Sequence, residues 1–293
     1  MGACSLWALD TLIRYPLIES GISAFSIVFY EHLILTLISL TVFYKAFPTI
    51  LKAKRSHWGY FLIVGGVGSA LSTLAFTKAF TYLNPSLVIL LQKFQPVIAI
   101  SLARVVLKEK VERIFILWAM VCLAGALLIS YEDILKVFYS DKSLRELLFH
   151  SDSLQGYMLV CFSVMGWGAS TVFGKKLLYI GYQDEQILAG RFAFGFVCLL
   201  PFISMESSLL ELGVNEFSKI SLMVLVSGLL AMYLYYHGLR KISARACSLT
   251  ELFFPFMAVL VNWMFLGATL TGVQLLGGLL LIIGSVIIQL KKY

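Results

Sequence analysis

Charged residues are scarce in this chain. Lysine, arginine, aspartate and glutamate make up 13% of the 293 residues, whereas 60% are hydrophobic. A soluble domain usually carries about 25% charged residues, and fewer than half of its residues are apolar. The composition therefore excludes an ordinary water-soluble domain and predicts a chain that folds in lipid.

Motifs for several kinds of chemistry are also missing. The five cysteines lie in apolar runs without a C-x-x-C pair, so we expect neither a disulfide framework nor a redox motif. No H-E-x-x-H sequence or P-loop occurs, which argues against an enzyme, a metal site or a bound cofactor. The first apolar segment lacks a basic leader, so no removable signal peptide is expected.

Ten apolar segments follow one another along the chain, and most are close to the ~20 residues that cross a bilayer. They are predicted as helices at residues 1–18, 23–47, 58–80, 84–106, 113–131, 154–176, 184–204, 217–238, 243–265 and 271–290. A polar stretch of mixed charge, residues 132–153, separates the first five segments from the last five. It predicts a short amphipathic helix at the membrane surface.

The two groups of five segments are internal repeats. An offset of 159 residues relates Gln92 to Glu251 and Pro96 to Pro255, and an offset of 160 relates Trp7 to Trp167, Asp10 to Ser170 and Glu31 to Arg191. Because each group has an odd number of spans, the second must be inverted relative to the first, as in many secondary transporters. We therefore predict an all-α integral membrane fold of ten transmembrane helices as two inverted five-helix repeats, at 1–131 and 154–293, joined by an external segment at 132–153.

Basic residues divide unevenly between the two sides of this arrangement. With a cytoplasmic N-terminus, 15 of the 23 lysines and arginines fall on the cytoplasmic side, Lys175 among them, and 6 fall on the other side, Arg14 among them. The positive-inside rule then places both termini in the cytoplasm. The net charge of +7 thus reflects topology, and we expect no nucleic-acid partner. Compact loops favour a bacterial inner membrane.

Short motifs in both halves point to a known family. They are Leu6-Trp7 followed by Arg14, the stretch from Ala75 through Pro96 to Val111, then Trp167-Gly168, Gly190-Arg191-Phe192, and Tyr236 through Pro255 to Gly267. This pattern resembles the EamA-type transporters of the drug/metabolite transporter superfamily. The resemblance implies ten helices, a central cavity lined by helices 1–4 and 6–9, and helices 5 and 10 as an outer scaffold. One departure is that the family's Arg-Phe pair in helix 2 reads Glu31-His32 here, so a substrate rule built on two arginines does not carry over.

Glu31 and Arg191 are the first candidate pair for a binding site, because ionisable groups at membrane depth usually face a cavity or a partner. They occupy equivalent positions in the two halves. They can bind opposite ends of a zwitterionic solute, with Glu31 also a candidate to take up a proton. A structural ion pair between helices 2 and 7 explains them equally simply.

Gln92 and Glu251 form the second pair, each four residues before a proline. A proline removes the donor to the carbonyl four residues earlier, which is how broken helices expose polar groups in transporters. Kinks for packing alone remain the alternative. Glu251 is our leading candidate for a proton-coupling carboxylate, since burial disfavours its ionised form. Lys93 is a candidate charge partner for Glu251 or for a substrate carboxylate.

Aromatic and small polar residues complete the candidate site. Trp7 and Trp167 are candidates to wall the cavity beside Asp10 and Ser170, although packing or an interfacial belt explains the tryptophans as well. Tyr236 sits in an aromatic cluster at the end of helix 8, which is typical of a belt and leaves gating as the second interpretation. The pair Gly277-Gly278 predicts close packing of helix 10, with a homodimer contact as one use.

These observations favour a secondary carrier. We expect an exporter or exchanger of a small polar metabolite, such as an amino acid or a related zwitterion or organic cation, working by alternating access, with proton coupling left open. A nucleotide-sugar or nucleoside carrier is the alternative within the class. A channel or a non-transporting scaffold is the alternative outside it, although no selectivity filter is recognisable. The expected partners are the solute and the lipid bilayer, with the protein a monomer or a homodimer.

Overall fold

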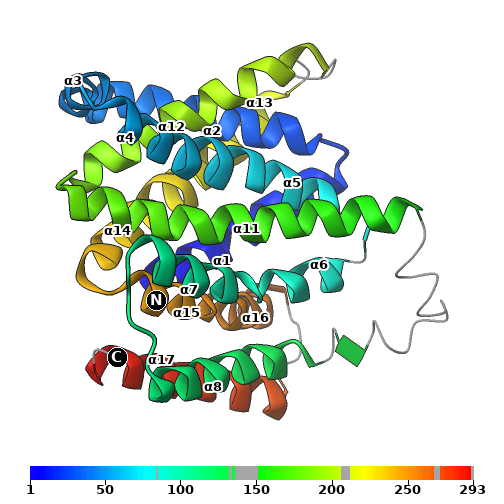
Figure 1. Cartoon of the computed structure of the whole chain (residues 1–293). Coiled ribbons are helices and arrows are strands. Elements are labelled where there is room, and N and C mark those ends of the chain that lie inside the picture. Colours follow the sequence, from blue (N-terminus) through cyan, green and yellow to red (C-terminus); the bar gives the residue numbers. More distant parts are fainter. Residues whose placement is uncertain (84, 132–133, 136–150, 206–211, 267–270, 292–293) are drawn as a thin grey trace.

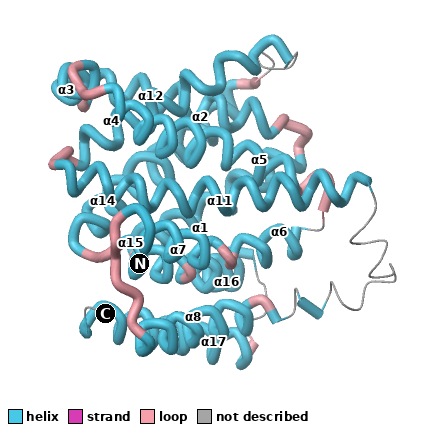
Figure 2. The backbone as a smooth tube through the Cα atoms, in the orientation of Figure 1, coloured by secondary structure: helices cyan, strands magenta, loops and turns pink. Residues whose placement is uncertain are grey.

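The computed structural model describes residues 1–83, 85–131, 134–135, 151–205, 212–266 and 271–291. Over these ranges the chain is helical, without a strand (Figures 1 and 2). The first half contains α1 (Gly2–Glu19), α2 (Ala24–Val42), η1 (Tyr44–Ala46), α3 (Phe47–Leu51), α4 (Arg55–Phe61), η2 (Leu62–Leu71), α5 (Ser72–Ala79), α6 (Pro85–Gln92), α7 (Gln95–Val106) and α8 (Arg113–Ile129). The second contains α11 (Ser151–Ile180), α12 (Asp184–Leu199), η3 (Leu200–Met205), α13 (Val214–Met223), η4 (Val224–Leu230), α14 (Ala231–Lys241), α15 (Ala244–Glu251), α16 (Phe253–Leu266) and α17 (Gly272–Lys291).

Length and composition identify the helices that can cross a membrane. Within the described ranges, seven continuous helical stretches are long and apolar enough to do so, and α8 and α17 are shorter apolar helices. The chain is therefore a multi-pass membrane protein. The predicted total of ten spans goes beyond this finding and stays a prediction, as do the boundaries of the two repeats.

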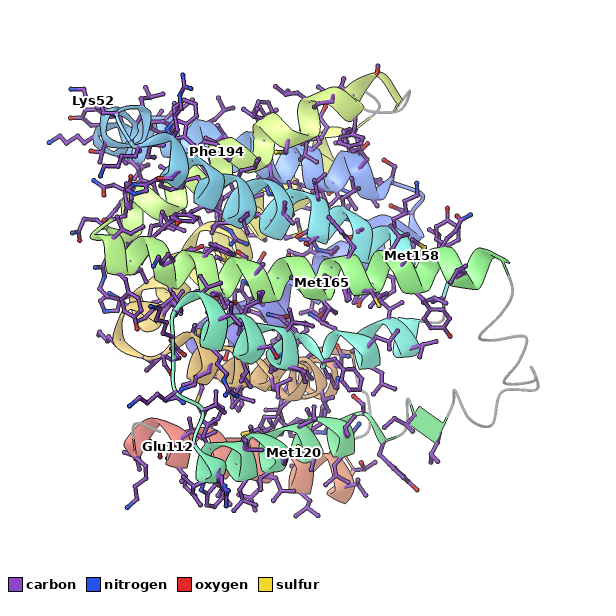
Figure 3. The ribbon with its side chains drawn as sticks, viewed as in Figure 1. Lys52, Glu112, Met120, Met158, Met165 and Phe194 are labelled. Carbon is purple, nitrogen blue, oxygen red and sulfur yellow. The ribbon has the colours of Figure 1, made fainter. Side chains whose placement is uncertain are left out.

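Large apolar side chains cover much of the outer surface. Met120, Met158 and Met165 are 58%, 65% and 58% exposed, and Figure 3 shows them on the sides of the bundle. Lys52 and Glu112 lie instead at the end of the bundle that also holds both termini (Figures 1 and 3). An apolar surface of this extent is unfavourable in water and suits contact with lipid chains.

Helices α8 and α17 form a pair at one edge of the bundle (Figures 1 and 2). A methyl group added at Gly125 would lie 2.6 Å from the backbone oxygen of Gly277, and one at Gly277 would lie 2.6 Å from that of Gly125. Gly278 packs in the same manner against Phe256 of α16. The glycine face of α17 is thus packed within the chain, and the homodimer contact stays a prediction.

Two helices contain π-helical segments, which are rare and frequent at functional sites. The first, η2, packs against α11 and α12, and the second, η4, packs against α1 and α2. Glycines make the first contact possible, because a side chain at Gly65 would overlap the backbone of Arg191 and one at Gly68 would overlap Ser170. The segment η2 therefore brings the helical stretch Arg55–Ala79 directly against Arg191 and Ser170, two candidate site residues.

The helices that contain Pro96 and Pro255 both break where the sequence predicted. Helix α6 ends at Gln92 and α7 begins at Gln95, while α15 ends at Glu251 and α16 begins at Phe253. Across the first break the backbone makes tighter turns, with the amides of Lys93 and Phe94 donating to carbonyls three residues earlier, each at 3.1 Å. The pattern follows from the missing N–H of the proline that follows each break.

Three other expectations about elements have different outcomes. The helix predicted at 23–47 ends at Val42, because the chain turns there and starts a short helix with Pro48 in its first turn. The helix predicted at 154–176 continues to Ile180, and Lys175 lies inside it instead of in a loop. Lys175 is 3% exposed and donates to the carbonyl oxygens of Leu239 and Arg240 at 2.7 and 3.1 Å. Of the amphipathic helix predicted at 132–153, residues 132–133 and 136–150 lie outside the described ranges.

Candidate functional site

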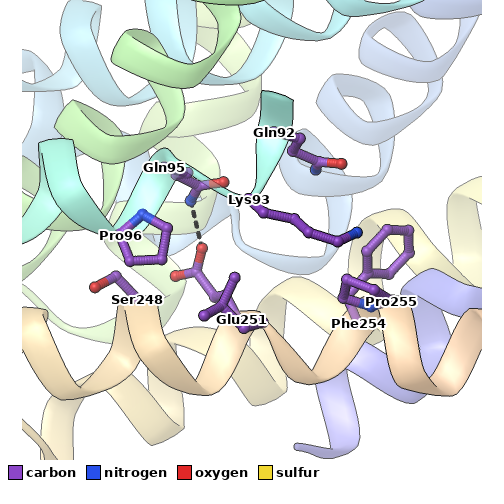
Figure 4. Close-up of a pocket in the computed structure, with 9 residues that line it drawn as sticks. Gln92, Lys93, Gln95, Pro96, Ser248, Glu251, Phe254 and Pro255 are labelled. Carbon is purple, nitrogen blue, oxygen red and sulfur yellow. Dashed lines mark hydrogen bonds between the residues drawn. The ribbon is translucent and has the colours of Figure 1, made fainter. Parts of the chain in front are cut away.

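A small cavity lies between the two broken helices, where α7 packs against α15 (Figure 4). Its volume is about 30 Å³. It is lined by Gln92, Lys93, Gln95, Pro96, Ser248, Glu251, Leu252, Phe254 and Pro255. Both helix breaks therefore open onto the same space, and three of the predicted site residues, Gln92, Lys93 and Glu251, meet there.

The carboxylate of Glu251 is the most heavily bonded group at this cavity. Its Oε2 accepts from Gln95 Nε2 at 2.5 Å, the contact drawn in Figure 4. Its Oε1 accepts from the hydroxyls of Tyr235 and Thr171 at 3.0 and 3.2 Å and from the thiol of Cys247 at 3.8 Å. Donors from α7, α11, α14 and α15 thus converge on one acid.

Lys93 provides a basic group at the same cavity. Its side chain is 2% exposed although it belongs to the turn between α6 and α7. Figure 4 shows the Lys93 side chain extending across the cavity towards Phe254 and Pro255. The described lining of the cavity thus includes one acid and one base, which come from the two different broken helices.

Aromatic rings stand beside the Glu251 network. Trp7 packs against Tyr235 with ring centres 5.6 Å apart, and Tyr235 packs against Tyr236 at 5.3 Å. Trp7 therefore adjoins the network through the ring of Tyr235, whose hydroxyl bonds Glu251. Trp167 instead packs against Phe76 at 4.9 Å, in line with the packing interpretation of that residue.

A second cluster surrounds Arg191 of α12. Its Nη1 donates to Ser170 Oγ at 2.8 Å and to the Tyr236 hydroxyl at 3.3 Å, while Nε has no hydrogen-bond partner among the described residues. Tyr236 is fully buried, so the interpretation of this residue as part of an interfacial belt is wrong. Two predicted site residues of the second half, Ser170 and Arg191, therefore meet, and Arg191 also binds Tyr236.

A third cluster joins α1, α2 and η4 through Arg14. The guanidinium contacts Asp10 at 2.6 and 3.1 Å and Glu31 at 3.1 Å, and the Ser227 hydroxyl donates to Asp10 at 2.7 Å. Arg14 is thus a buried partner for two acids and not an outer-loop charge. Glu31 pairs with Arg14, and the described residues show no ion pair between Glu31 and Arg191. The alternative interpretation of these two residues, a structural ion pair between the predicted helices at 23–47 and 184–204, is therefore not observed.

His32 is a packed residue beside this cluster. It is 1% exposed, with Nδ1 2.9 Å from the carbonyl oxygen of Val28 and Nε2 3.1 Å from Ser69 Oγ. Its ring nitrogens are both in contact with other groups of the chain, and it joins α2 to the π-helical segment η2.

Polar contacts also tie together the end of the bundle that holds the termini. Glu109 accepts from the backbone amides of Ala244 and Arg245 at 2.9 and 3.2 Å, so it caps the start of α15. Asp184 pairs with Arg240 at 2.7 Å. Burial raises the pKa of the nearby Tyr182 hydroxyl, which lies 2.9 Å from His57 Nδ1. These contacts hold neighbouring helix ends against one another.

Sequence reasoning missed several residues that complete these clusters. Gln95 stands directly before Pro96, and the spacing of four between Asp10 and Arg14 is that of a helical ion pair, so both carried a usable signal. Thr171 and Tyr235 carried none, because their roles depend on which helices pack together.

Comparisons with known proteins agree on the class. The sequence model of the EamA-like transporter family matches residues 1–131 and 154–290. A riboflavin transporter, ImpX, of Fusobacterium nucleatum subsp. nucleatum is 31% identical over 99% of this chain and 95% of its own length. An uncharacterized transporter of Clostridium kluyveri is 26% identical over 81% of this chain and 74% of its own.

The fold recurs in solved structures as well. One crystal structure superposes with a TM-score of 0.73 at 14% identity, covering 99% of this chain and 96% of its own, which shows a shared fold. The match of the family model over nearly the whole chain decides the class. This chain belongs to the EamA-like transporter family and is a transporter, not an enzyme.

Proposed function

We propose that the protein is a secondary carrier of riboflavin or a similarly flat, uncharged solute, working by alternating access. The observation that carries this proposal is the 31% identity to a riboflavin transporter over 99% of the chain. The chain has no P-loop, so the driving force is a gradient of the solute or of a coupled ion.

The polar groups of the site support an uncharged solute. Arg14 already neutralises Asp10 and Glu31, so neither acid is held ready for a substrate amine. Hydroxyl, amide and aromatic groups dominate around Glu251, and such groups suit a heteroaromatic ring with hydrogen-bonding edges.

A zwitterionic solute such as an amino acid is the second candidate. Lys93 and Glu251 line the same cavity and carry opposite charges, which matches an ammonium and a carboxylate on one molecule. The roles of Trp7, Asp10, Gln92, Trp167, Ser170 and Tyr236 in binding either solute are part of this proposal.

The proposed architecture is two inverted repeats of five spans. Supporting it, Gly21 and Gly181, 160 residues apart, both have positive φ angles, of 92° and 111°, at the ends of α1 and α11. Contacts also exchange between the halves, since η2 packs on α12 and η4 on α2, while α1 packs on α16 and α11 on α7. The proposed site lies where these halves meet.

The proposed location is a bacterial inner membrane with both termini in the cytoplasm. Both termini lie at the same end of the bundle (Figure 1), and this end also holds Lys52. Lys175 and Arg14 lie inside the bundle, so each leaves the count of basic residues on its side of the membrane. One residue is lost from each side, and the excess of basic residues on the cytoplasmic side, which supports this orientation, remains.

The size of the cavity supports alternating access. A volume of about 30 Å³ holds water but is far below the ~300 Å³ or more of a typical ligand pocket. A solute can therefore bind only after the helices around the cavity separate. The described conformation corresponds to the closed state of such a cycle.

Flux into proteoliposomes tests the proposal. Purified protein should take up labelled riboflavin with saturation, and preloading with unlabelled riboflavin should accelerate entry, which a channel would not show. Adding a mixture of zwitterionic amino acids as competitors, and measuring the flux of labelled amino acids, tests the second candidate solute. Amino-acid flux without riboflavin flux would replace the first proposal with the second, and flux of neither would overturn both.

A further inference from the structure

The two carboxylate oxygens of Glu251 accept hydrogen bonds from different halves of the protein. Oε1 accepts from Tyr235, Thr171 and Cys247 of the second half, whereas Oε2 accepts from Gln95 of the first half. Among the described residues, Gln95 is the hydrogen-bond donor to Oε2. One oxygen is thus held by the second half itself, and the other depends on a donor that belongs to the opposite half.

Gln95 is placed where the cavity has to open. It is the first residue of α7, directly after the break, and Glu251 is the last residue of α15. Both residues line the cavity, and Gln95 is 9% exposed. Any separation of α7 from α15 that makes room for a solute withdraws the amide from Oε2. The carboxylate is then left with an unmet acceptor in a low-dielectric site, which is costly.

We propose that the Gln95 amide is an internal substitute for an N–H group of the solute, so that the solute is recognised through this donor. The inference rests on the proposed function and specifies its recognition group. The isoalloxazine ring of riboflavin carries one N–H, at N3, between two carbonyl groups. That N–H replaces Gln95 on Glu251 Oε2 in the open state. Gln92 and Lys93, on the same cavity wall, supply donors for the flanking carbonyl oxygens.

A competing role for Gln95 and a purely structural role predict opposite changes in solute affinity when Gln95 is removed. If Gln95 only braced Glu251, its removal would loosen the site and weaken solute binding or leave it unchanged. If Gln95 competes with the solute for Oε2, its removal strengthens binding, because the closed state loses a hydrogen bond that the bound state never had. A net hydrogen bond corresponds to roughly a twofold to tenfold change in affinity.

Binding measurements on the detergent-purified full chain test this, with riboflavin and N3-methylriboflavin as probes and flavin fluorescence as the signal. Gln95→Met keeps the side-chain length without the donor. Gln155→Met makes the same change at an exposed position of α11 and is the matched control. We expect Gln95→Met to bind riboflavin about twofold to tenfold more tightly than the unmodified chain, with the control unchanged. The unmodified chain should bind N3-methylriboflavin at least about tenfold more weakly than riboflavin.

The outcomes separate this inference from the proposed function. Riboflavin binding that is indifferent to N3-methylation, or that Gln95→Met weakens or leaves unchanged, overturns the inference while the carrier function stands. Absence of riboflavin binding and flux overturns the proposed function and this inference with it. The N3-methyl comparison uses the unmodified chain, so it decides the question even when Gln95→Met does not fold.

Discussion

At the scale of single residues, one guanidinium holds two carboxylates from different helices. Arg14 binds Asp10 of its own helix through two nitrogens and Glu31 of α2 through one, with 15% of its side chain exposed. The forked shape of the guanidinium makes this possible, and a lysine has no equivalent geometry. Burial makes the arrangement costly to break, because an acid left without its partner keeps its desolvation penalty.

Replacing Arg14 should therefore destabilise the protein strongly. We expect Arg14→Gln to lower the free energy of unfolding by about 3 kcal/mol, since it leaves two buried acids uncompensated. Thermal unfolding in detergent measures this, with Arg55→Gln at an exposed helix start as the control. Adding Glu31→Gln to the Arg14→Gln variant should recover part of the loss. An unchanged melting temperature for Arg14→Gln would show that the three charges do not depend on one another.

The side chain of Glu251 gives a second prediction. Glutamine keeps a hydrogen-bonding group of the same size but cannot exchange a proton. Glu251→Gln should therefore abolish accumulation driven by an imposed pH gradient. Solute exchange should persist, at a reduced rate, because the one amide oxygen of glutamine can still accept from the solute. Both are measured as labelled riboflavin flux in proteoliposomes, with Glu19→Gln at an exposed position as the control. Accumulation at the unmodified level by a correctly inserted variant would remove Glu251 from proton coupling.

At the scale of helices, contact between glycine backbones fixes the pair α8 and α17. Their closest approach is at Gly125 and Gly277, where each lacks the side chain that would strike the other backbone. Small residues at such positions let helices approach within van der Waals contact in lipid, where no hydrophobic effect drives them together. The association of α8 with α17 thus depends on how closely their glycine surfaces fit together.

Adding one methyl group to this contact should separate the helices. Gly277→Ala is expected to cost about 1–3 kcal/mol, the usual range for overpacking a close contact. Gly59→Ala is the matched control, because a methyl group there meets no atom within 4 Å. Circular dichroism melts in detergent compare the two variants, and equal melting temperatures would contradict the packing role.

How far the sequence predicts these elements depends on whether a signal is local. Pro96 and Pro255 predicted both helix breaks because the loss of one backbone donor is a property of the residue itself. Lys175 and Arg14 were misplaced because counting basic residues near helix ends does not show which side chains turn inward to carbonyls or acids. Tyr235 and Thr171 could not be predicted, since nothing in their neighbourhood of the sequence reveals that they meet Glu251 from two other helices.

At the scale of the whole molecule, polar ties are gathered at the end that holds the termini. Glu109 caps α15 from the loop after α7, and Asp184 pairs with Arg240 across the ends of α12 and α14. The Glu109 contacts join the two halves, whereas the Asp184–Arg240 pair ties two helices of the second half together. We therefore expect the Glu109 contacts to break when the halves separate at this end.

Loosening one tie should open the cavity from that side. In a chain whose native cysteines are replaced by alanine, Ser248→Cys places a thiol at a buried position on the cavity wall. Adding Glu109→Gln is expected to speed its reaction with a membrane-impermeant maleimide severalfold when the reagent is applied on the side of the termini. Lys110→Gln, an exposed change in the same loop, should have no effect. Equal acceleration from both faces of the liposome would contradict a gate at this end.

The small volume of the central cavity has a consequence for the energetics of the cell. About 30 Å³ between Glu251 and the two broken helices admits a water molecule or two but no continuous file of them. A carrier that rests in this form therefore offers ions no wet path through the bilayer when its cargo is scarce. We therefore expect idle copies to leave the membrane potential intact, so that a cell can keep many of them without dissipating the gradients that power its other pumps.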